Sequence, residues 1–393
     1  MRPIQILILM TIGWYLVLSL GHFLNQRPLW NDELCVLNNI VQLDPAKIFE
    51  RPLLSNQAFP RPYLVGIQQF SKSFNYHLLA LRFFPFLSML AAFVVWFRIT
   101  QRTLDNTWYL VLYIACWCGS VPMVYYAAEL KSYSMDVLAA GLIVWFLLDK
   151  KEIQKNFTVY RLILFFLPWL ALLSYPAIFL LILPLWNLIE ESINQRKCLP
   201  ELSVYLSSCL LILGLLYYFD FRVSARYLLE ENWHDYFISF HSWKDFFSTF
   251  GKGMNNLIGR RFAENPRWIK IPSRAFLGMS MGYMLVMGIR QLRKDRFILS
   301  SLASISLVIF CLQLLLAIFH VYPFAVPRMS LFFSPLLFIM LVLGLRHLQE
   351  RFKPWGMVFQ CFLAGYLVFI SLGITWDIFV KKDLSAESKL YGA

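Results

Sequence analysis

Two adjacent carboxylates stand shortly after the first apolar run of the chain, in the segment Trp30-Asn31-Asp32-Glu33. Neighbouring acids repel each other, so their presence at the start of a loop needs a reason. One reason is chemical, because a carboxylate at a membrane surface can act as a general base that takes a proton from a hydroxyl group. The other is local, because Asp32 could cap a helix over residues 33–42. Trp30 suits a membrane interface under both interpretations.

A second group of ionisable residues follows the third long apolar run. If this part of the chain is helical, Glu129, Tyr133 and Asp136 recur at i, i+4 and i+7 and share one helix face. Asp136 would then lie about one helical turn inside the membrane, where an ionisable side chain is a functional candidate by default. The alternative is a structural acid that pairs with Lys131 or with Arg82.

Basic residues concentrate at the end of a long later loop, where the chain returns to an apolar run. Such a cluster at a membrane surface can bind the phosphate group of a lipid substrate. It can equally be a solvated surface, or a contact to anionic lipid headgroups. The cluster consists of Arg260, Arg261, Arg267, Lys270 and Arg274.

The segment 320–328 has the pattern of a tight turn set by two prolines, Pro323 and Pro327. Its last residue, Arg328, could clamp a phosphate leaving group, or it could simply extend its charged end along the membrane interface. His320 at the start of the turn could be a metal ligand, although a lone histidine is more often an interface residue.

The composition of the chain indicates which elements must position these residues. Of 393 residues, 59% are apolar and only 15% are charged, whereas soluble domains carry about 25% charged residues. Uncharged runs recur that are long enough to cross the ~30 Å hydrocarbon core of a bilayer, which takes roughly 20 residues. The sequence therefore predicts an all-α, polytopic transmembrane helix bundle. It argues against a soluble enzyme, a secreted disulfide-bonded domain, a disordered chain and a β-barrel with short alternating strands.

Eleven membrane passes are predicted if the amino terminus is cytoplasmic. The uncharged run 162–189 contains three prolines and is too long for one pass, so we expect two short passes that turn near 174–176. This choice keeps basic segments such as 149–161 on the cytoplasmic side, as the positive-inside rule requires. The net charge of +13 then reflects topology and not nucleic acid binding. The other predicted helices are 4–24, 77–98, 108–126, 130–149, 202–221, 273–290, 297–319, 328–345 and 355–376.

Two long loops, residues 25–76 and 222–272, fall on the same external side in this arrangement. Each has about 50 residues, and loops of such length are usually functional, so we expect both to carry short interfacial helices. Neither an internal repeat nor a separate soluble domain is visible, and residues 1–393 are interpreted as one membrane domain. The cytoplasmic segments contain no glycine-rich phosphate loop that would indicate ATP or nucleotide-sugar chemistry. The seven cysteines lie mostly in apolar runs, where they are interpreted as packing residues.

These elements, taken in order, resemble the glycosyltransferase C superfamily. The most similar branch contains the lipopolysaccharide core galacturonosyltransferases, the protein mannosyltransferases and the aminoarabinose transferases. The resemblance runs from residue 4 to about residue 149 and includes one element before a late helix. The matching elements are Asp32-Glu33, Phe59-Pro60-Arg61-Pro62-Tyr63-Leu64, Leu81-Arg82, Glu129-Leu130-Lys131-Ser132-Tyr133, and Tyr322-Pro323 followed by Arg328.

The resemblance implies a reaction and a role for each residue. Members of the superfamily take a sugar from a polyprenyl-phosphate carrier on the external face of the membrane. Asp32 would be the general base for an acceptor hydroxyl in a single inverting displacement, which needs one base and not the two carboxylates of a hydrolase. Glu33 and Glu129 would orient the acceptor or bind a divalent metal ion, with His320 as a further candidate ligand. The implied substrate-binding residues are Lys131, Tyr133, Arg82, Arg260, Arg261, Arg328 and Tyr322, whose cations would neutralise the leaving phosphate.

The implied partners are a polyprenyl-phosphate-linked sugar donor, a glycolipid, glycan or protein acceptor, and membrane lipids. A bacterial inner membrane is the expected location. Two other functions stay open. A lipid-linked oligosaccharide polymerase or ligase would depend on Arg260 and Arg261 more than on Asp32. A transporter or flippase of a lipid-linked sugar would show charges at the membrane midplane and matching repeats, of which the sequence offers only Asp136.

Overall fold

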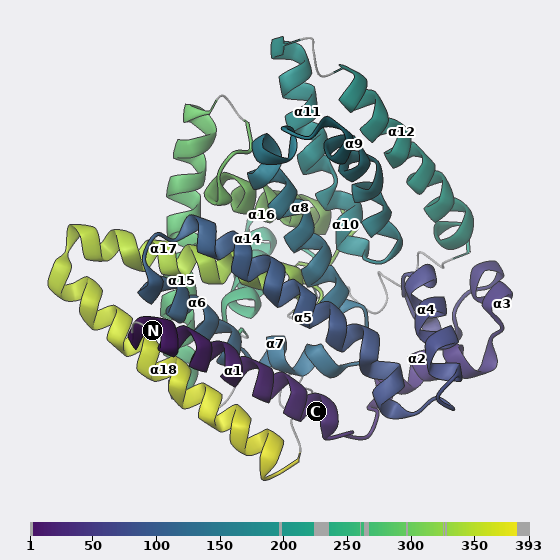
Figure 1. The fold of residues 1–393 in the computed structure, drawn as a ribbon, viewed down its shortest axis with the longest axis horizontal. Coiled ribbons are helices and arrows are strands. Elements are labelled where there is room, and N and C mark those ends of the chain that lie inside the picture. Colours follow the sequence, from purple (N-terminus) through teal and green to yellow (C-terminus); the bar gives the residue numbers. More distant parts are fainter. Residues whose placement is uncertain are drawn as a thin grey trace.

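Figure 1 shows the computed structural model of the chain, a bundle of helices joined by turns. Within the described ranges the secondary structure consists of helices and irregular turns, and no strand occurs. The all-α class predicted from the composition is therefore confirmed. The structure describes residues 3–195, 199–223, 236–259, 261–262, 267–295, 298–324, 326 and 328–382.

Six described helical segments are long and apolar enough to cross a membrane, by length and composition. A seventh candidate consists of α6 (Thr107–Cys118) and the segment Val121–Ala128, which meet at a bend of 69°. Several long apolar helices are what a multi-pass membrane protein requires, whereas the finer count of eleven passes stays a prediction. The six are α1 (Pro3–Leu24), α5 (Leu78–Thr103), Tyr175–Ile193 with most of α11 (Ile182–Gln195), Leu199–Phe221 with α12 (Leu199–Leu216), Leu331–Arg351 with α17 (Ser334–Arg351), and α18 (Lys353–Phe379).

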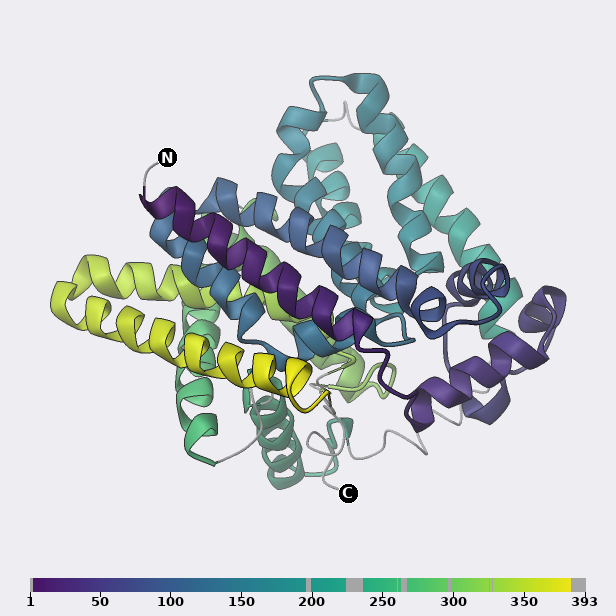
Figure 2. The same cartoon turned by 60° about the horizontal axis from the view of Figure 1, so that its bottom comes forward.

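Four further helices coincide with predicted passes. Within the bundle α5 packs along α8, and α15 packs against α16 and α17. Figures 1 and 2 show α1 and α18 side by side at one edge of the bundle, where Asn25 Nδ2 donates to the Ile378 carbonyl at 2.6 Å. The end of α1, where the first long loop begins, therefore lies against the end of α18. The four helices are α8 (Tyr133–Ile153), α9 (Phe157–Phe166), α15 (Arg267–Lys294) and α16 (Leu302–Ile318).

The helix break predicted near residues 174–176 is present. The 3-10 helix η3 (Leu167–Leu172) ends just before it, and α10 (Tyr175–Leu180) begins just after it. Ser174 caps α10, because its Oγ accepts a hydrogen bond from a backbone N–H three residues later at 3.4 Å. Pro176 lies in the first turn, where its missing N–H costs nothing. One continuous helix through this apolar run is therefore excluded.

The third predicted helix, residues 108–126, is broken. It ends before Gly119, which lies so close to α18 that an added Cβ would come 2.9 Å from the Leu367 side chain. A new short helix, α7 (Val121–Tyr125), starts with Pro122 in its first turn. Proline has no N–H with which to continue the preceding helix, and this explains why an uncharged run does not form one straight span.

The chain between η2 (Tyr126–Ala128) and α8 is not helical. Glu129 has an extended backbone, with φ of −110° and ψ of 139°, and α8 begins only at Tyr133. The predicted helix face shared by Glu129, Tyr133 and Asp136 is therefore wrong, because only the last two lie on α8. A physical reason is that the N–H of Leu130, which a helix would use, donates instead to a side chain of the first long loop at 2.8 Å.

The first long loop folds into a compact group of short helices. Its apolar side chains form a small core that continues onto Leu81 of α5 and Leu130. Figures 1 and 2 show this group at one end of the molecule, opposite the turn between α17 and α18. The expectation of short helices in this loop is confirmed. They are α2 (Asn31–Gln42), α3 (Pro45–Glu50), η1 (Leu54–Asn56) and α4 (Arg61–Lys72).

Asp32 does not cap the helix that follows it, which corrects the local interpretation of the acid pair. Trp30 occupies the N-cap position of α2, and Glu33 Oε2 accepts a hydrogen bond from the Trp30 N–H at 3.4 Å. Asp32 lies inside the first turn, where a carboxylate interacts favourably with the helix dipole. Of the second long loop, the structure describes residues 222–223, 236–259, 261–262 and 267–272, including α14 (Trp243–Gly259).

Candidate functional site

Asp32 lies between two cations that come from distant parts of the chain. Its Oδ1 is 2.8 Å from Lys131 Nζ, and its Oδ2 accepts a hydrogen bond from Arg328 at 3.0 Å. Lys131 also donates to Gln57 Oε1 of the first loop at 2.6 Å. The side chain of Asp32 is 19% exposed and that of Arg328 is 15% exposed, so water reaches this point. We call Asp32, Lys131 and Arg328 the Asp32 cluster.

The charges of the Asp32 cluster set the acidity of its carboxyl group. Burial alone would raise the pKa of Asp32, but the charges of Lys131 and Arg328, together with hydrogen bonds from Lys131 and Gln57, lower this pKa below its ordinary value. Trp30 adds an aromatic ring whose centroid is 5.8 Å from the Arg328 guanidinium carbon. Asp32 is therefore ionised at neutral pH, and one carboxylate with two cations leaves the cluster one net positive charge.

Glu33 is fully buried at the centre of a network of hydrogen bonds. Arg82 binds both of its carboxylate oxygens, at 3.1 and 2.9 Å, and Arg27 donates to Oε2 at 2.8 Å. The backbone N–H of Leu130 donates to Oε1 at 2.8 Å. This arrangement fixes the first loop onto α5 and onto the chain before α8. Arg82 is therefore a buried ion-pair partner of Glu33.

The two adjacent acids of α2 therefore have different surroundings. Successive residues of a helix point about 100° apart, so Asp32 faces the partly exposed cluster and Glu33 faces the interior. Glu33 binds the backbone of Leu130, while Asp32 binds the side chain of Lys131. Two neighbouring acids thus hold two neighbouring residues of a non-helical segment in place.

Asp136 and Tyr133 lie in the first turn of α8 and do not join the Asp32 cluster through any ion pair. Asp136 is buried, and neither of its predicted partners pairs with it, because Lys131 and Arg82 bind the acids of α2. The interpretation of Asp136 as an acid paired with these residues is therefore wrong. Tyr133 packs edge-on against Tyr126, with ring centroids 5.3 Å apart.

Arg261 supports the turn that carries Arg328. Its fully buried guanidinium donates to Ser334 Oγ at 2.8 Å and to Ser330 Oγ. Tyr322 supports the same turn, because its hydroxyl donates at 2.7 Å to the backbone carbonyl of the residue that follows Arg328. Two residues predicted to bind substrate therefore hold groups that directly follow Arg328 in the chain.

The candidate metal ligands Glu33, Glu129 and His320 are not assembled into one site. Glu33 is bound by guanidinium groups, Glu129 is fully buried, and His320 stacks on Phe237 with ring centroids 4.9 Å apart. Among the residues that the structure describes, no group of three or more His, Cys, Asp or Glu side chains is arranged to hold a metal ion. We therefore derive no catalytic step through a metal. Arg260 lies outside the described residues.

A second buried ion pair, which sequence patterns did not reveal, joins the first loop to a distant helix. Arg61 Nε is 3.1 Å from Asp220 Oδ1, and both side chains are almost fully buried. The Tyr175 hydroxyl donates to the other oxygen of Asp220 at 2.7 Å, and Arg61 also binds the carbonyls of Ile48 and Arg51 at the end of α3. The sequence feature that could have indicated this ion pair is an acid, Asp220, at the end of a long apolar run.

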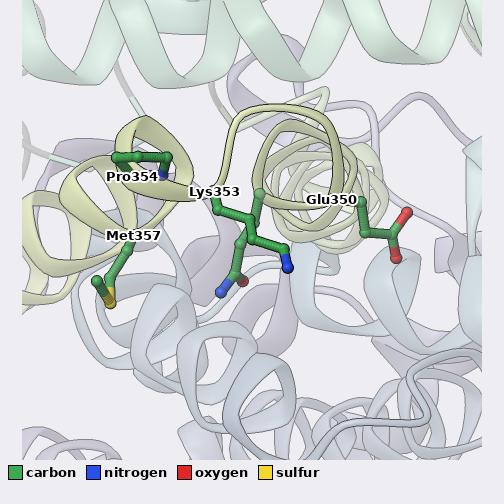
Figure 3. Close-up of a pocket in the computed structure, with 5 residues that line it drawn as sticks. Glu350, Lys353, Pro354 and Met357 are labelled. Carbon is green, nitrogen blue, oxygen red and sulfur yellow. The ribbon is translucent and has the colours of Figure 1, made fainter.

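A cavity of about 560 Å³ lies far from the Asp32 cluster. It is beside the turn between α17 and α18, at the end of the molecule opposite α2 and α4 in Figures 1 and 2. Figure 3 shows the side chains of Glu350 and Lys353 projecting from this turn. None of the residues predicted for the site lines this cavity. Its lining residues are Gln349, Glu350, Lys353, Pro354 and Met357.

No protein-family model, no curated protein and no solved structure matches the chain. The Asp32 cluster brings one carboxylate and two cations from distant parts of the chain together at a partly exposed point.

Proposed function

We propose that the chain is an integral membrane glycosyltransferase that moves a sugar from a polyprenyl-phosphate carrier to an acceptor hydroxyl. The observation that carries this proposal is the Asp32 carboxylate, partly exposed, held between Lys131 and Arg328. A glycosyl transfer from a lipid phosphate needs a base for the acceptor and positive charge for the leaving phosphate. The Asp32 cluster brings both kinds of group together at one end of a bundle of apolar helices.

The reaction is a single displacement at the anomeric carbon. The acceptor hydroxyl gives its proton to the Asp32 carboxylate as its oxygen forms the new bond to the anomeric carbon. The bond from that carbon to the phosphate oxygen breaks, and its electron pair leaves with the phosphate, which Lys131 and Arg328 neutralise. Attack opposite the leaving group inverts the anomeric configuration, and one carboxylate suffices because no glycosyl-enzyme intermediate forms.

The pairing of Asp32 with both cations suggests how donor binding prepares the base. Before the donor binds, the two cations lower the pKa of Asp32 and make it a weak proton acceptor. When an anionic phosphate binds, Lys131 and Arg328 donate some of their hydrogen bonds to the phosphate instead of to Asp32. Asp32 then loses stabilising partners, its pKa rises, and it becomes a stronger base only when the donor is in place.

This exchange of partners predicts different pH dependences for kcat/KM and kcat. Since the pKa of Asp32 in the free protein is lowered, its charged form persists above that pKa and is lost as the pH falls through it. The acid limb of kcat/KM, which reports the free protein, is expected below the ordinary aspartate value of about 4. The acid limb of kcat, which reports the bound complex, is expected at a higher pH.

The test is a pair of pH profiles with donor varied at saturating acceptor. Each sample is returned to neutral pH and assayed again, so that acid unfolding is not mistaken for titration of Asp32. Coincident acid limbs for kcat/KM and kcat would contradict the exchange of partners.

Loss of a cation is expected to weaken use of the donor. In Lys131→Gln or Arg328→Gln, one charged hydrogen bond of about 1.5–3 kcal/mol is lost, so kcat/KM for the donor should fall roughly ten- to hundredfold. Lys131→Arg keeps the charge and should recover part of the loss. The matched control is Lys47→Gln, because Lys47 is exposed and pairs with Asp44 at the surface. Unchanged kcat/KM in both cluster variants would show that the two cations take no part in the reaction.

We place the reaction on the external, periplasmic face of a bacterial inner membrane, with a glycolipid, glycan or protein as acceptor. Support comes from the predicted topology, which puts both long loops on one side, and from the basic residues in the short segments assigned to the cytoplasm. Attachment of a membrane-impermeant label to cysteines placed at exposed Asp44 and at exposed Glu152 would test the sidedness. Only the cysteine at residue 44 should react from the periplasm.

A further inference from the structure

An aromatic patch covers one side of α14 and takes no part in the Asp32 cluster. It consists of Phe240, Trp243 and Phe247, which are 56%, 69% and 64% exposed. Their rings contact one another, with centroids 5.5 Å apart for Phe240 and Trp243, and 6.2 Å apart for Trp243 and Phe247. Three large aromatic side chains that contact each other and remain exposed form an apolar patch of the kind that marks an interaction site.

The arrangement of side chains around α14 gives the helix an apolar side and a charged side. Each residue advances about 100° around the axis, so Phe250 and Leu257 fall on the side that packs on the protein. By the same spacing Trp243 lies about 20° and Phe247 about 60° from Phe250, so they continue this side at the first turns of the helix, where both are exposed. Lys252 lies about 140° from Phe247 and is exposed. The apolar side thus packs on the protein at Phe250 and Leu257 and is exposed at the aromatic first turns, and the other side is charged.

Further exposed apolar side chains lie at the end of the apolar helix to which the chain before the aromatic patch is attached. Immediately after α16, Phe319 and Val321 are 72% and 56% exposed. The chain leading into α14 is attached at the same place, because Ile238 N donates to the Ala317 carbonyl at 3.4 Å. An exposed aromatic surface at the point where an apolar helix ends is typical of the boundary between headgroups and acyl chains, where Trp and Tyr are enriched.

We propose that α14 is an interfacial helix that inserts its aromatic patch into the bilayer surface. Its partner is the boundary between lipid headgroups and acyl chains. Lys244 lies beside Phe247 on the helix surface and is exposed, where it can contact anionic headgroups, whereas Lys252 faces water. The helix thus has the apolar side and the charged side that interfacial helices use to bind membranes. This inference depends on the chain being a membrane protein and not on the reaction proposed for it.

Binding of lipid by α14 would also position the turn that contains Arg328. Phe250 of α14 stacks on Phe324 of that turn, with ring centroids 6.0 Å apart. Gly253 allows this close approach, because a Cβ at this position would clash with the Phe324 ring. The side of α14 next to the aromatic patch is therefore the side that packs against the turn leading to the Asp32 cluster.

The test compares two cysteine probes on the same helix, Phe247→Cys on the aromatic patch and Lys252→Cys on the charged side. The background carries Cys311→Ala and Cys361→Ala, because these native cysteines are exposed. The full chain is labelled with bimane and reconstituted in phosphatidylethanolamine–phosphatidylglycerol vesicles. Quenching is measured with a doxyl-labelled lipid and, separately, with aqueous iodide.

At residue 247 the doxyl lipid should quench at least about threefold more than at residue 252, and iodide should show the reverse order, as expected for a helix lying in the interface. Strong iodide quenching with no lipid quenching at residue 247 would overturn the proposal, because the patch would then face water. Protection of residue 247 from both quenchers would also overturn it, because another protein surface would then cover the patch. Neither readout requires transferase activity.

Discussion

Replacing Asp32 by asparagine is expected to slow sugar transfer by at least about a hundredfold, the size of effect that a general base contributes. Asparagine keeps the shape of the side chain but cannot accept the proton of the acceptor hydroxyl. Asp32 and Arg328 are 19% and 15% exposed, but Lys131 is only 7% exposed and loses an ionic partner, so the stability of the variant is measured beside its rate. The measurement is the initial rate of transfer at saturating donor and acceptor, together with a melting curve of the same preparation.

Asp44→Asn is the matched control for this prediction. Asp44 belongs to the same loop, but its side chain is 73% exposed and pairs with Lys47 at the surface, so its loss should leave the rate within about twofold, as is usual for an exposed ion pair. Full activity in Asp32→Asn would contradict the assignment of the base. The base would then have to be sought at Glu33 or Glu129.

Replacing Glu33 by glutamine is expected to destabilise the folded protein more than any other change at the acid pair. Glutamine cannot neutralise the buried guanidinium groups of Arg27 and Arg82, which Glu33 holds at 2.8 and 2.9 Å. Removing one partner from a buried ion pair costs about 3–5 kcal/mol. We expect a clear drop in melting temperature and a lower yield of folded protein, measured in the same detergent for all variants.

The control for Glu33→Gln is Glu152→Gln, which breaks an exposed pair with Lys155 and should change stability by less than about 1 kcal/mol. The two interpretations of Glu33 predict different results. If Glu33 is a structural acid, the Glu33→Gln variant has low stability, and the fraction of it that stays folded keeps much of its activity. A melting curve like that of the unchanged protein, combined with loss of activity, would show that Glu33 acts on the substrate directly.

Sequence patterns could locate the acid pair but could not assign a separate role to each of its two acids. Asp32 and Glu33 have the same chemistry and adjacent positions, and only the helical geometry of α2 turns one outward and the other inward. Lys131 and Arg328 were both predicted for the site, yet their contact with the same carboxylate spans almost the whole chain. Arg27 was not predicted as a partner of Glu33, because a single arginine after an apolar helix has the pattern of an interface residue.

The apolar runs predicted the helices well where backbone hydrogen bonding within each run was undisturbed. The break near Ser174 was predictable from its prolines and is present. The bend at Gly119 and Pro122 was not predicted, although Pro122 is the same kind of sequence signal as the prolines near Ser174. The non-helical backbone at Glu129 could not be predicted either, since it depends on a hydrogen bond between Leu130 and an acid of the first loop.

The most direct test of the central proposal is transfer by the purified protein in reconstituted vesicles. A panel of radiolabelled polyprenyl-phosphate sugars is supplied as donors, and both labelled acceptor and free polyprenyl phosphate are measured. The account predicts that the unchanged protein releases carrier in step with sugar transfer, and that Asp32→Asn does so at least about a hundredfold more slowly. Movement of intact lipid-linked sugar between leaflets, without release of carrier from any donor, would contradict the account and would indicate a transporter.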